Sequence, residues 1–271
     1  MPAFNAISSD KLVRLIGTPD CPTVLDVRSE ADALLPASFR RSAEDVESWA
    51  DVYAGRQVVV ACVNGHERSA GVAAYLRTTG ATAEVLEGGF AAWKEAGLPT
   101  IDPEKLPRRD RRDRTVWVTR ARPKVDRIAC PWLIRRFVDP EAVFLYVAPA
   151  EVTGVSERFG ATPFDVEGVL WSHRGELCTF DVMVEELGLT GFSALAHLAV
   201  IVRGADTARP EIAPQAAGLV AASLGLSRMY SDDLEQLEAG MVLYDAFYRW
   251  CRDAVDETHD WVSHTPRRSR K

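Results

Sequence analysis

The chain has 271 residues, of which 47% are hydrophobic and 26% are charged. This composition is typical of a water-soluble globular protein, and the length is sufficient for two domains of ordinary size. The formal net charge of −7 disfavours a general role in nucleic-acid binding. No apolar run is long enough to predict a membrane-spanning helix. The amino-terminal residues show no basic segment followed by an apolar one, so we predict a cytoplasmic protein.

Cysteines are odd in number, widely spaced and never in a Cys-x-x-Cys pair. This distribution indicates free thiols rather than a disulfide framework. The residues are Cys21, Cys62, Cys130, Cys178 and Cys251.

Short apolar strands alternate with helical segments over the first hundred residues. The stretch Ser8-Ser9-Asp10 precedes the apolar helix face of Leu12, Leu15 and Ile16, as a helix cap would. Further helices are expected at residues 43–54, 69–79 and 89–97, and strands at residues 23–28, 58–61 and 83–86. In the helix at 43–54, the side chains expected to face inward are Val46, Trp49, Val52 and Tyr53. The alternation predicts an α/β fold in which helices cover both faces of a parallel sheet.

Residues 102–114 form a proline-bearing, highly charged stretch with almost no apolar side chains. Such a composition is typical of a solvated linker, and its arginines offer an alternative role in gripping an acidic partner. The expected division of the chain is a first domain at 1–101, a charged linker at 102–114, a second domain at 115–258 and a basic, disordered tail at 259–271.

The second half begins with strands and ends with helices, which predicts an α+β domain with a helical carboxyl-terminal half. Strands are expected at residues 115–120, 142–147 and 168–173. Helices are expected at residues 130–137, with Pro131 near the first turn, and at 192–203, 213–224 and 232–255. The last helix carries an apolar stripe that we interpret as core packing, made by Leu234, Leu237, Met241, Tyr244, Phe247 and Trp250.

The strand at 58–61 ends on Cys62, and an Asn-Gly loop then leads into an alanine-rich helix. The unpaired amides and the dipole at a helix amino terminus stabilise a thiolate, which lowers the thiol pKa. Arg68 adds a positive charge at the end of the loop. This arrangement predicts a reactive thiol, and the alternative is a buried, inert structural cysteine. The substrate-binding residues expected in the loop are Val63, Asn64, Gly65, His66 and Glu67.

Several motifs together resemble a rhodanese domain over about residues 5 to 100. They are Asp26-Val27-Arg28 at a strand end, Cys62 with its glycine-containing loop, Arg68-Ser69, Leu86-Glu87-Gly88-Gly89-Phe90-x-x-Trp93 and Gly97-Leu98-Pro99. The resemblance implies that Cys62 takes a sulfane sulfur from thiosulfate or a persulfide and delivers it to a thiol or cyanide. The backbone amides of residues 63–68 would stabilise the anionic persulfide, and no cofactor is required.

Two features depart from the commonest rhodanese pattern. Arg68 lies six residues after Cys62, giving Cys-x5-Arg, where many single-domain members have the arginine one residue earlier. The longer loop resembles rhodanese-fold dual-specificity phosphatases and arsenate reductases, in which Arg68 would clamp a tetrahedral oxyanion and Glu67 or His66 would be the general acid. The stretch Leu35-Pro36-Ala37-Ser38-Phe39 also matches the usual His-Ile-Pro-Gly-Ala only loosely.

The second half resembles the carboxyl-terminal domain of ChrB-type chromate-resistance proteins over about residues 115 to 257. The motifs are the run from Asp126 to Phe137, Phe164-Asp165, His173-x-Gly175-Glu176-x-Cys178-Thr179-Phe180, Arg203-Gly204-Ala205-Asp206 and Leu243-Tyr244-Asp245. The resemblance implies a link to chromate sensing and regulation.

Imidazole, carboxylate and thiolate groups gather in these motifs. The expected metal ligands, for zinc or another transition metal, are His173, Glu176 and Cys178. Residues expected to converge on them are Asp126, Cys130 and Asp165. A rival interpretation is an oxyanion pocket with Arg127, Arg135 and Arg136 as donors.

Three functions follow from these features. The leading one is a sulfurtransferase with a persulfide on Cys62, acting on a small-molecule sulfur donor and a thiol acceptor and associated with chromate resistance or oxidative stress. The second is an oxyanion phosphatase or reductase that uses the Cys-x5-Arg loop. The third is a non-catalytic sensor whose second domain binds chromate or a metal. No membrane partner is expected, and nucleic acid is disfavoured.

Overall fold

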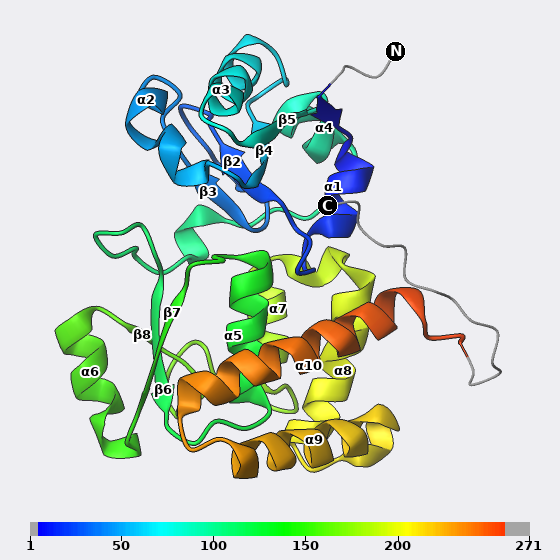
Figure 1. The fold of residues 1–271 in the computed structure, drawn as a ribbon. Coiled ribbons are helices and arrows are strands. Elements are labelled where there is room, and N and C mark those ends of the chain that lie inside the picture. Colours follow the sequence, from blue (N-terminus) through cyan, green and yellow to red (C-terminus); the bar gives the residue numbers. More distant parts are fainter. Residues whose placement is uncertain (1–4, 258–271) are drawn as a thin grey trace.

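A five-stranded parallel sheet forms the centre of the first domain (Figure 1). The computed structural model describes residues 5–257. The strand order is β1-β5-β4-β2-β3. The strands are β1 (Ala6–Ile7), β2 (Thr23–Asp26), β3 (Ser38–Arg40), β4 (Gln57–Ala61) and β5 (Thr82–Leu86). The parallel α/β architecture expected from the alternating pattern is confirmed.

The two faces of this sheet are buried against different helices, because successive side chains of a strand point to opposite faces. Val58 and Val60 of β4 pack with α3 and with the short helical segments near residue 50. Val59 and Ala61 pack on the opposite face with α1 and α4. The helices are α1 (Ser9–Leu15), α2 (Val46–Trp49), α3 (Glu67–Thr78) and α4 (Gly89–Glu95), with the 3-10 turn η1 (Ala50–Tyr53).

Most expected elements of this domain are present. Ser8 caps α1 by accepting a hydrogen bond from the amide of Lys11. The single helix expected at 43–54 is instead a four-residue helix followed by a 3-10 turn. Val52 was expected to face inward but is 61% exposed. The tighter 3-10 turn shifts the helical phase by that point, so Ala50 is buried in place of Val52, while Tyr53 is buried as expected.

A three-stranded parallel sheet opens the second domain, in the order β7-β6-β8. The strands are β6 (Val116–Arg120), β7 (Val143–Val147) and β8 (Thr162–Pro163). The prediction of a strand at residues 168–173 is wrong. The chain turns there, with Gly168 at φ +82° and the amide of Asp165 donating to the carbonyl of Trp171. This turn packs Trp171 edge-on against Trp117, 5.9 Å between ring centroids.

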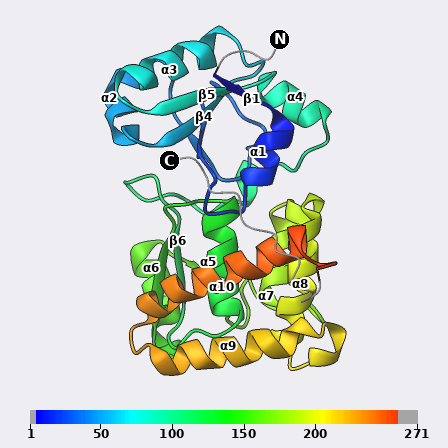
Figure 2. The ribbon, with the colours of Figure 1, turned by 45° about the vertical axis from the view of Figure 1, so that its right-hand side comes forward.

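Helices form the rest of the second domain, and α6 covers one face of the small sheet through Val152 and Val118. Figures 1 and 2 show α5, α7, α8, α9 and α10 gathered on the other side. The helices are α5 (Asp126–Phe137), α6 (Val152–Phe159), α7 (Thr179–Glu186), α8 (Ser193–Asp206), α9 (Gln215–Met229) and α10 (Asp233–Asp253). The 3-10 turns are η2 (Pro103–Lys105), η3 (Pro149–Glu151), η4 (Leu189–Gly191) and η5 (Pro210–Ile212). The expected α+β domain with a helical carboxyl-terminal half is confirmed.

Helix α5 begins at Asp126, four residues before the expected start, so Pro131 lies inside the helix and not near its first turn. A proline has no amide hydrogen and leaves the carbonyl four residues earlier without its helical partner. That carbonyl belongs to Arg127, and it accepts a 2.8 Å hydrogen bond from the hydroxyl of Tyr146. The side chain from β7 thus replaces the missing helical bond.

The apolar stripe of α10 is core packing, as expected. Leu237, Met241 and Tyr244 are buried, whereas Leu234 in the first turn is 51% exposed. Trp132 of α5 is surrounded by the rings of Phe137, Phe180, Tyr244 and Tyr248.

The charged stretch 102–114 lies against both domains rather than in solvent alone. Arg41 of the first domain pairs with Asp113 at 2.5 Å. Arg109 pairs with the buried Asp139 of the second domain at 3.4 Å. Arginines and aspartates of the stretch therefore neutralise partners within the chain.

The domains also meet directly, through hydrogen bonds and an apolar contact. The amide of Ala37 donates a 2.6 Å hydrogen bond to the carbonyl of Phe137. Gly17 lies against the rings of Phe137 and Tyr248, and Arg252 near the end of α10 donates to the carbonyl of Arg14. In Figure 2 the end of α10 approaches the first domain beside α1. None of the helices between residues 5 and 257 has the length and apolarity needed to span a membrane. The basic tail expected at 259–271 lies outside the described residues.

Candidate active site and acidic cluster

Cys62 directly follows β4, at the carboxyl edge of the parallel sheet, where loops of such sheets carry functional groups. The residue is 6% exposed, and the loop that follows leads into α3 at Glu67. Asn64, His66 and Glu67 are exposed, Val63 is 54% exposed, and Gly65 and Arg68 are half-buried. The expected strand, loop and helix are therefore present.

The sulfur of Cys62 is surrounded by hydrogen-bond donors. Burial alone would raise the pKa of the thiol, but hydrogen bonds from the Ser69 side chain and from the amides of Ser69, His66 and Asn64 hold it below its ordinary value. The Ser69 hydroxyl lies 3.0 Å from the sulfur and 3.1 Å from the carbonyl of His66. It can donate to the sulfur once the thiol has ionised. This environment favours a thiolate.

Two glycines and helix α4 hold the loop in place. Gly65 has φ +72°, and a Cβ there would lie 2.6 Å from the carbonyl oxygen of Leu86. The amides of Phe90 and Ala91 at the start of α4 donate to the carbonyls of Cys62 and Val63, both at 2.9 Å. The Leu86–Trp93 motif therefore positions the cysteine loop from a neighbouring element.

Arg68 lines a cavity of about 360 Å³ beside the loop. Its guanidinium donates to the carbonyl of Val27 at 3.3 Å and pairs with Glu44 at 3.2 Å. Three further arginines line the same cavity: Arg28, Arg40 and Arg41. Arg28 and Arg41 are paired with Asp26 and Asp113, so Arg40 and the exposed Arg68 are the cavity arginines best placed to meet an anion.

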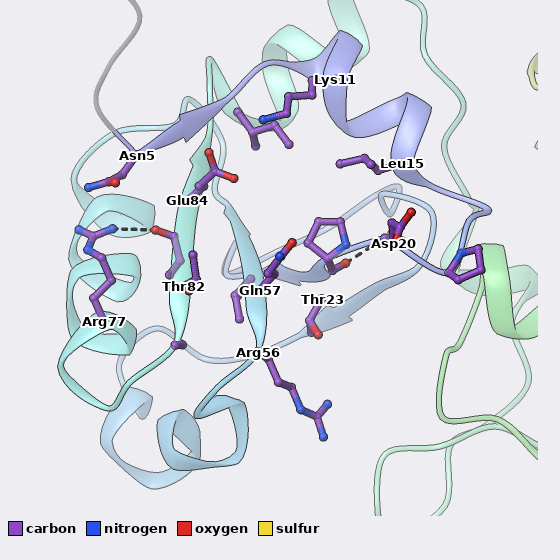
Figure 3. Close-up of a pocket in the computed structure, with 17 residues that line it drawn as sticks. Asn5, Lys11, Leu15, Asp20, Thr23, Arg56, Gln57, Arg77, Thr82 and Glu84 are labelled. Atoms are coloured by element: carbon purple, nitrogen blue, oxygen red, sulfur yellow. Dashed lines mark hydrogen bonds between the residues drawn. The ribbon is translucent and has the colours of Figure 1, made fainter. Parts of the chain in front are cut away.

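A cavity of about 1460 Å³ lies at the opposite edge of the sheet. Figure 3 shows Thr23, Gln57 and Thr82 around it, which are the first residues of β2, β4 and β5. Because Cys62 follows the last residue of β4, this cavity is separate from the reactive thiol.

A second group of titratable side chains lies in the second domain. The imidazole Nε2 of His173 is 3.1 Å from a carboxylate oxygen of Asp206 and 3.6 Å from oxygens of Asp126 and Asp165. One potential ligand atom each from Asp126, His173 and Asp206 lies within 4.8 Å of the others. We call these three residues the acidic cluster.

Asp165 lies beside the cluster and is engaged on both oxygens. One oxygen accepts from the hydroxyl of Thr179 at 3.1 Å. The other accepts from Arg120 at 3.0 Å and lies 3.2 Å from Arg127. Thr179 also donates its amide to Asp126 at 2.6 Å, so it joins the two carboxylates at the start of α7.

Burial dominates the protonation of the cluster. Desolvation, reinforced by the neighbouring carboxylates Asp206 and Asp165, raises the pKa of Asp126 well above its ordinary value. Burial and Asp165 likewise raise the pKa of Asp206. The second oxygen of Asp126, Oδ1, is buried without a hydrogen-bond partner among residues 5–257. Such a group is costly in a folded protein.

The expected ligand set His173, Glu176 and Cys178 is not assembled: His173 is grouped with Asp126 and Asp206 instead. The carboxylate of Glu176 is exposed and pairs with Arg209. Cys178 and Cys130 are fully buried, and desolvation raises the pKa of both thiols. Asp126 and Asp165 do lie near His173, each with an oxygen 3.6 Å from its Nε2.

The rival oxyanion pocket of three arginines is not assembled either. Arg135 pairs with Glu238 at 2.6 Å, and Arg136 pairs with Asp245 at 2.7 Å. Arg127 alone reaches the acidic cluster, through Asp165.

Two family models match the chain. The model of the rhodanese-like domain matches residues 8–96, and the model of the ChrB C-terminal domain matches residues 117–251. The chain joins a rhodanese-like domain to a ChrB C-terminal domain. Both resemblances seen in the sequence are thereby confirmed.

Individual relatives are similar over parts of the chain. Protein ChrB of Cupriavidus metallidurans is 34% identical over 157 residues, which are 56% of this chain and 43% of that protein. The chain thus spans less than half the length of this curated relative. A rhodanese-related protein from Thermoplasma volcanium is 25% identical over 36% of this chain and 98% of its own, with a TM-score of 0.33. A thiosulfate sulfurtransferase from Pseudomonas aeruginosa is 23% identical over 39% of this chain and 21% of its own, with a TM-score of 0.32.

One residue of the ChrB C-terminal domain was missed as a site residue. Asp206 stands in the Arg203–Asp206 motif, but it was not assigned to the site because it lies 80 positions from Asp126. The available signal was its position at the end of a helix otherwise rich in apolar residues. A carboxylate there needs a partner when the helix end is buried.

Proposed function

We propose that the rhodanese-like domain is a sulfurtransferase that carries sulfur as a persulfide on Cys62. The observation that carries this proposal is the environment of the sulfur. The Ser69 hydroxyl lies 3.0 Å from it, and this group together with three backbone amides lowers the thiol pKa despite its burial. A thiolate with the same donors around it has the means to stabilise an anionic persulfide.

In the proposed reaction the Cys62 thiolate attacks the sulfane sulfur of thiosulfate. The new S–S bond forms as the bond to the sulfite sulfur breaks, and sulfite leaves with the electron pair. A thiolate acceptor then attacks the outer sulfur, takes it as a persulfide and releases the Cys62 thiolate. No metal or cofactor enters this cycle.

The arginine-lined cavity beside the loop supports an anionic sulfur donor. Arg68 is shared between the cavity and the end of the Cys62 loop. Because Arg68 is 38% exposed and held by one exposed carboxylate, Glu44, an incoming anion can compete for it at little cost. We therefore propose a small, doubly charged donor such as thiosulfate and a thiol as acceptor.

The second proposal for the same site is an oxyanion phosphatase or reductase. The six-residue spacing from Cys62 to Arg68 favours it, because a wider loop admits a tetrahedral oxyanion. His66 and Glu67 are both exposed at the start of α3, where a general acid would be required.

Mass spectrometry of the intact chain after incubation with thiosulfate tests the first proposal. We expect the mass of one added sulfur atom on Cys62, its loss in Cys62→Ser and its retention in the matched control Cys21→Ser. Sulfur addition that persists in Cys62→Ser, or no addition at all, refutes it. Hydrolysis of p-nitrophenyl phosphate that disappears in Cys62→Ser would favour the phosphatase instead.

We further propose that this activity belongs to a cytoplasmic response to chromate or oxidative stress. The ChrB C-terminal domain and five free cysteines support this role. A non-catalytic chromate sensor is the alternative. Equal chromate affinity of the parent chain and Cys62→Ser, in a parent chain without sulfur transfer, would favour the sensor.

A further inference from the structure

We propose that Asp126, His173 and Asp206 of the ChrB C-terminal domain bind a divalent transition-metal ion. The three ligands come from separate parts of this domain. Asp126 is the first residue of α5, Asp206 is the last residue of α8, and His173 lies in the turn that precedes α7. Figures 1 and 2 both show α5, α7 and α8 side by side. The fold thus brings one imidazole and two carboxylates to a common point.

The strongest observation is the unpartnered oxygen of Asp126. The residue is 1% exposed, and its Oδ2 accepts from the amide of Thr179 and lies 3.6 Å from His173. Oδ1 has no hydrogen-bond partner among the described residues. The thiol of Cys178 also lies close enough to this carboxyl to lower its pKa. Because a buried carboxylate oxygen without a strong donor is costly, a cation bound by the cluster would stabilise the Asp126 carboxylate.

The charges around the cluster also call for a cation. Asp165 is satisfied by Arg120, Arg127 and Thr179, so its charge is already balanced. Asp126 and Asp206 face one another across His173 without an arginine or lysine within 4.0 Å of either, in the described part of the chain. A divalent ion would neutralise both carboxylates at once.

Asp165 is better suited to orient the site than to bind the metal. It lies 3.6 Å from His173 Nε2, but both of its oxygens already have donors. Thr179 links Asp165 to Asp126, which fixes the position of the first ligand. Partners of this kind commonly set ligand geometry around protein-bound metals.

The donor set indicates which ions fit. The imidazole disfavours Ca²⁺, which prefers ligands that are all oxygen. The absence of a thiolate from the set disfavours Cu⁺. Mn²⁺, Fe²⁺ and Zn²⁺ accept this mixture. Three protein ligands leave open coordination positions, and the site adjoins a cavity of about 330 Å³ lined by His173, Asp206 and Lys124. A metal can enter from solvent, since His173 is 42% exposed.

The test is metal binding by the full chain, freed of metal with a chelator and titrated separately with Mn²⁺ and Zn²⁺. Calorimetry gives stoichiometry and affinity, and the electron paramagnetic resonance spectrum of Mn²⁺ reports its immobilisation. The variants are His173→Ala, Asp206→Asn and Asp126→Asn. The matched control is Glu176→Gln, which removes an exposed carboxylate three positions from His173. Circular dichroism and thermal melting establish that each variant is folded.

We expect one ion per chain and a loss of at least about tenfold in affinity, roughly 1.4 kcal/mol, for each ligand variant. Glu176→Gln should bind like the parent. Should Asp126→Asn fail to fold, the exposed His173 and half-buried Asp206 variants decide the matter. The proposal is overturned if the parent binds neither ion. It is equally overturned if binding survives in both His173→Ala and Asp206→Asn.

Discussion

Gly89→Ala should lower the free energy of unfolding by more than the cost of placing an alanine in the left-handed conformation. Gly89 has φ +59°, and a Cβ there would lie 2.5 Å from the carbonyl oxygen of Cys62 and 2.5 Å from the amide nitrogen of Gly65. Those backbone atoms would have to retreat by about 0.9 Å to reach ordinary van der Waals contact at 3.4 Å. Both belong to the loop that places donors around the sulfur.

Gly97→Ala is the matched control. Gly97 has φ +66°, and a Cβ there would meet nothing within 4 Å. Each alanine should cost about 1–2 kcal/mol for the left-handed conformation, and Gly89→Ala should cost about 1–3 kcal/mol more for the clash. At roughly 2–4 °C per kcal/mol, we expect the midpoint of Gly89→Ala to lie about 2–12 °C below that of Gly97→Ala.

Differential scanning calorimetry measures the two midpoints, and iodoacetamide alkylation at neutral pH measures the reactivity of Cys62. Gly89→Ala should also slow alkylation, because displaced amides no longer stabilise the thiolate. Gly97→Ala should leave the rate unchanged. Equal midpoints and equal alkylation rates for the two variants would refute the view that Gly89 fixes the loop.

Three further predictions concern the thiol, helix α5 and the domain contact. Because hydrogen bonds lower the Cys62 pKa, its alkylation rate should reach half-maximum below pH 9.0, and Ser69→Ala should move that midpoint upward; an unmoved midpoint contradicts the role of Ser69. Tyr146→Phe should cost about 1–3 kcal/mol of stability by leaving the Arg127 carbonyl unpaired. The cost should be clearly smaller in a Pro131→Ala background, because the alanine amide can restore the helical hydrogen bond. Additive effects of the two substitutions in urea unfolding would show that the Tyr146 hydroxyl does not replace that bond. Gly17→Ala should lower the melting temperature more than Gly55→Ala, since a Cβ would meet Phe137 and Tyr248 only at Gly17; equal melting temperatures would exclude close packing at that contact.

The first domain could be predicted from sequence because its signals are local. The run Val58–Ala61 alternates between two helical layers, and its end on Cys62 fixes the edge at which the thiol lies. The loop and helix that follow complete the site within a few residues. Val52 was misplaced because its exposure depends on a change from α-helix to 3-10 turn, which the apolar pattern does not reveal.

The second domain was less predictable because its decisive interactions are distant in sequence. The run at 168–173 has the apolar character of a strand, but the turn at Gly168 removes it from the sheet. Pro131 indicated a helix start, whereas Tyr146 on another element permits it inside α5. The convergence of Asp126, His173 and Asp206 depends on the packing of α5, α7 and α8, so spacing along the chain favoured Glu176 and Cys178 instead.

The charged stretch 102–114 indicated two domains joined by a linker, yet a single apolar cluster runs from Ile16 and Leu35 into Phe137. A linker of this composition normally separates independent units. Here its charges are paired with Arg41 on one side and Asp139 on the other, so the stretch holds the domains together. Since the carbonyl of Phe137 accepts the amide of Ala37, any movement of α5 must be transmitted to the first domain or break this contact. The proposed metal site at Asp126 and this contact at Phe137 thus lie at opposite ends of the same helix, α5.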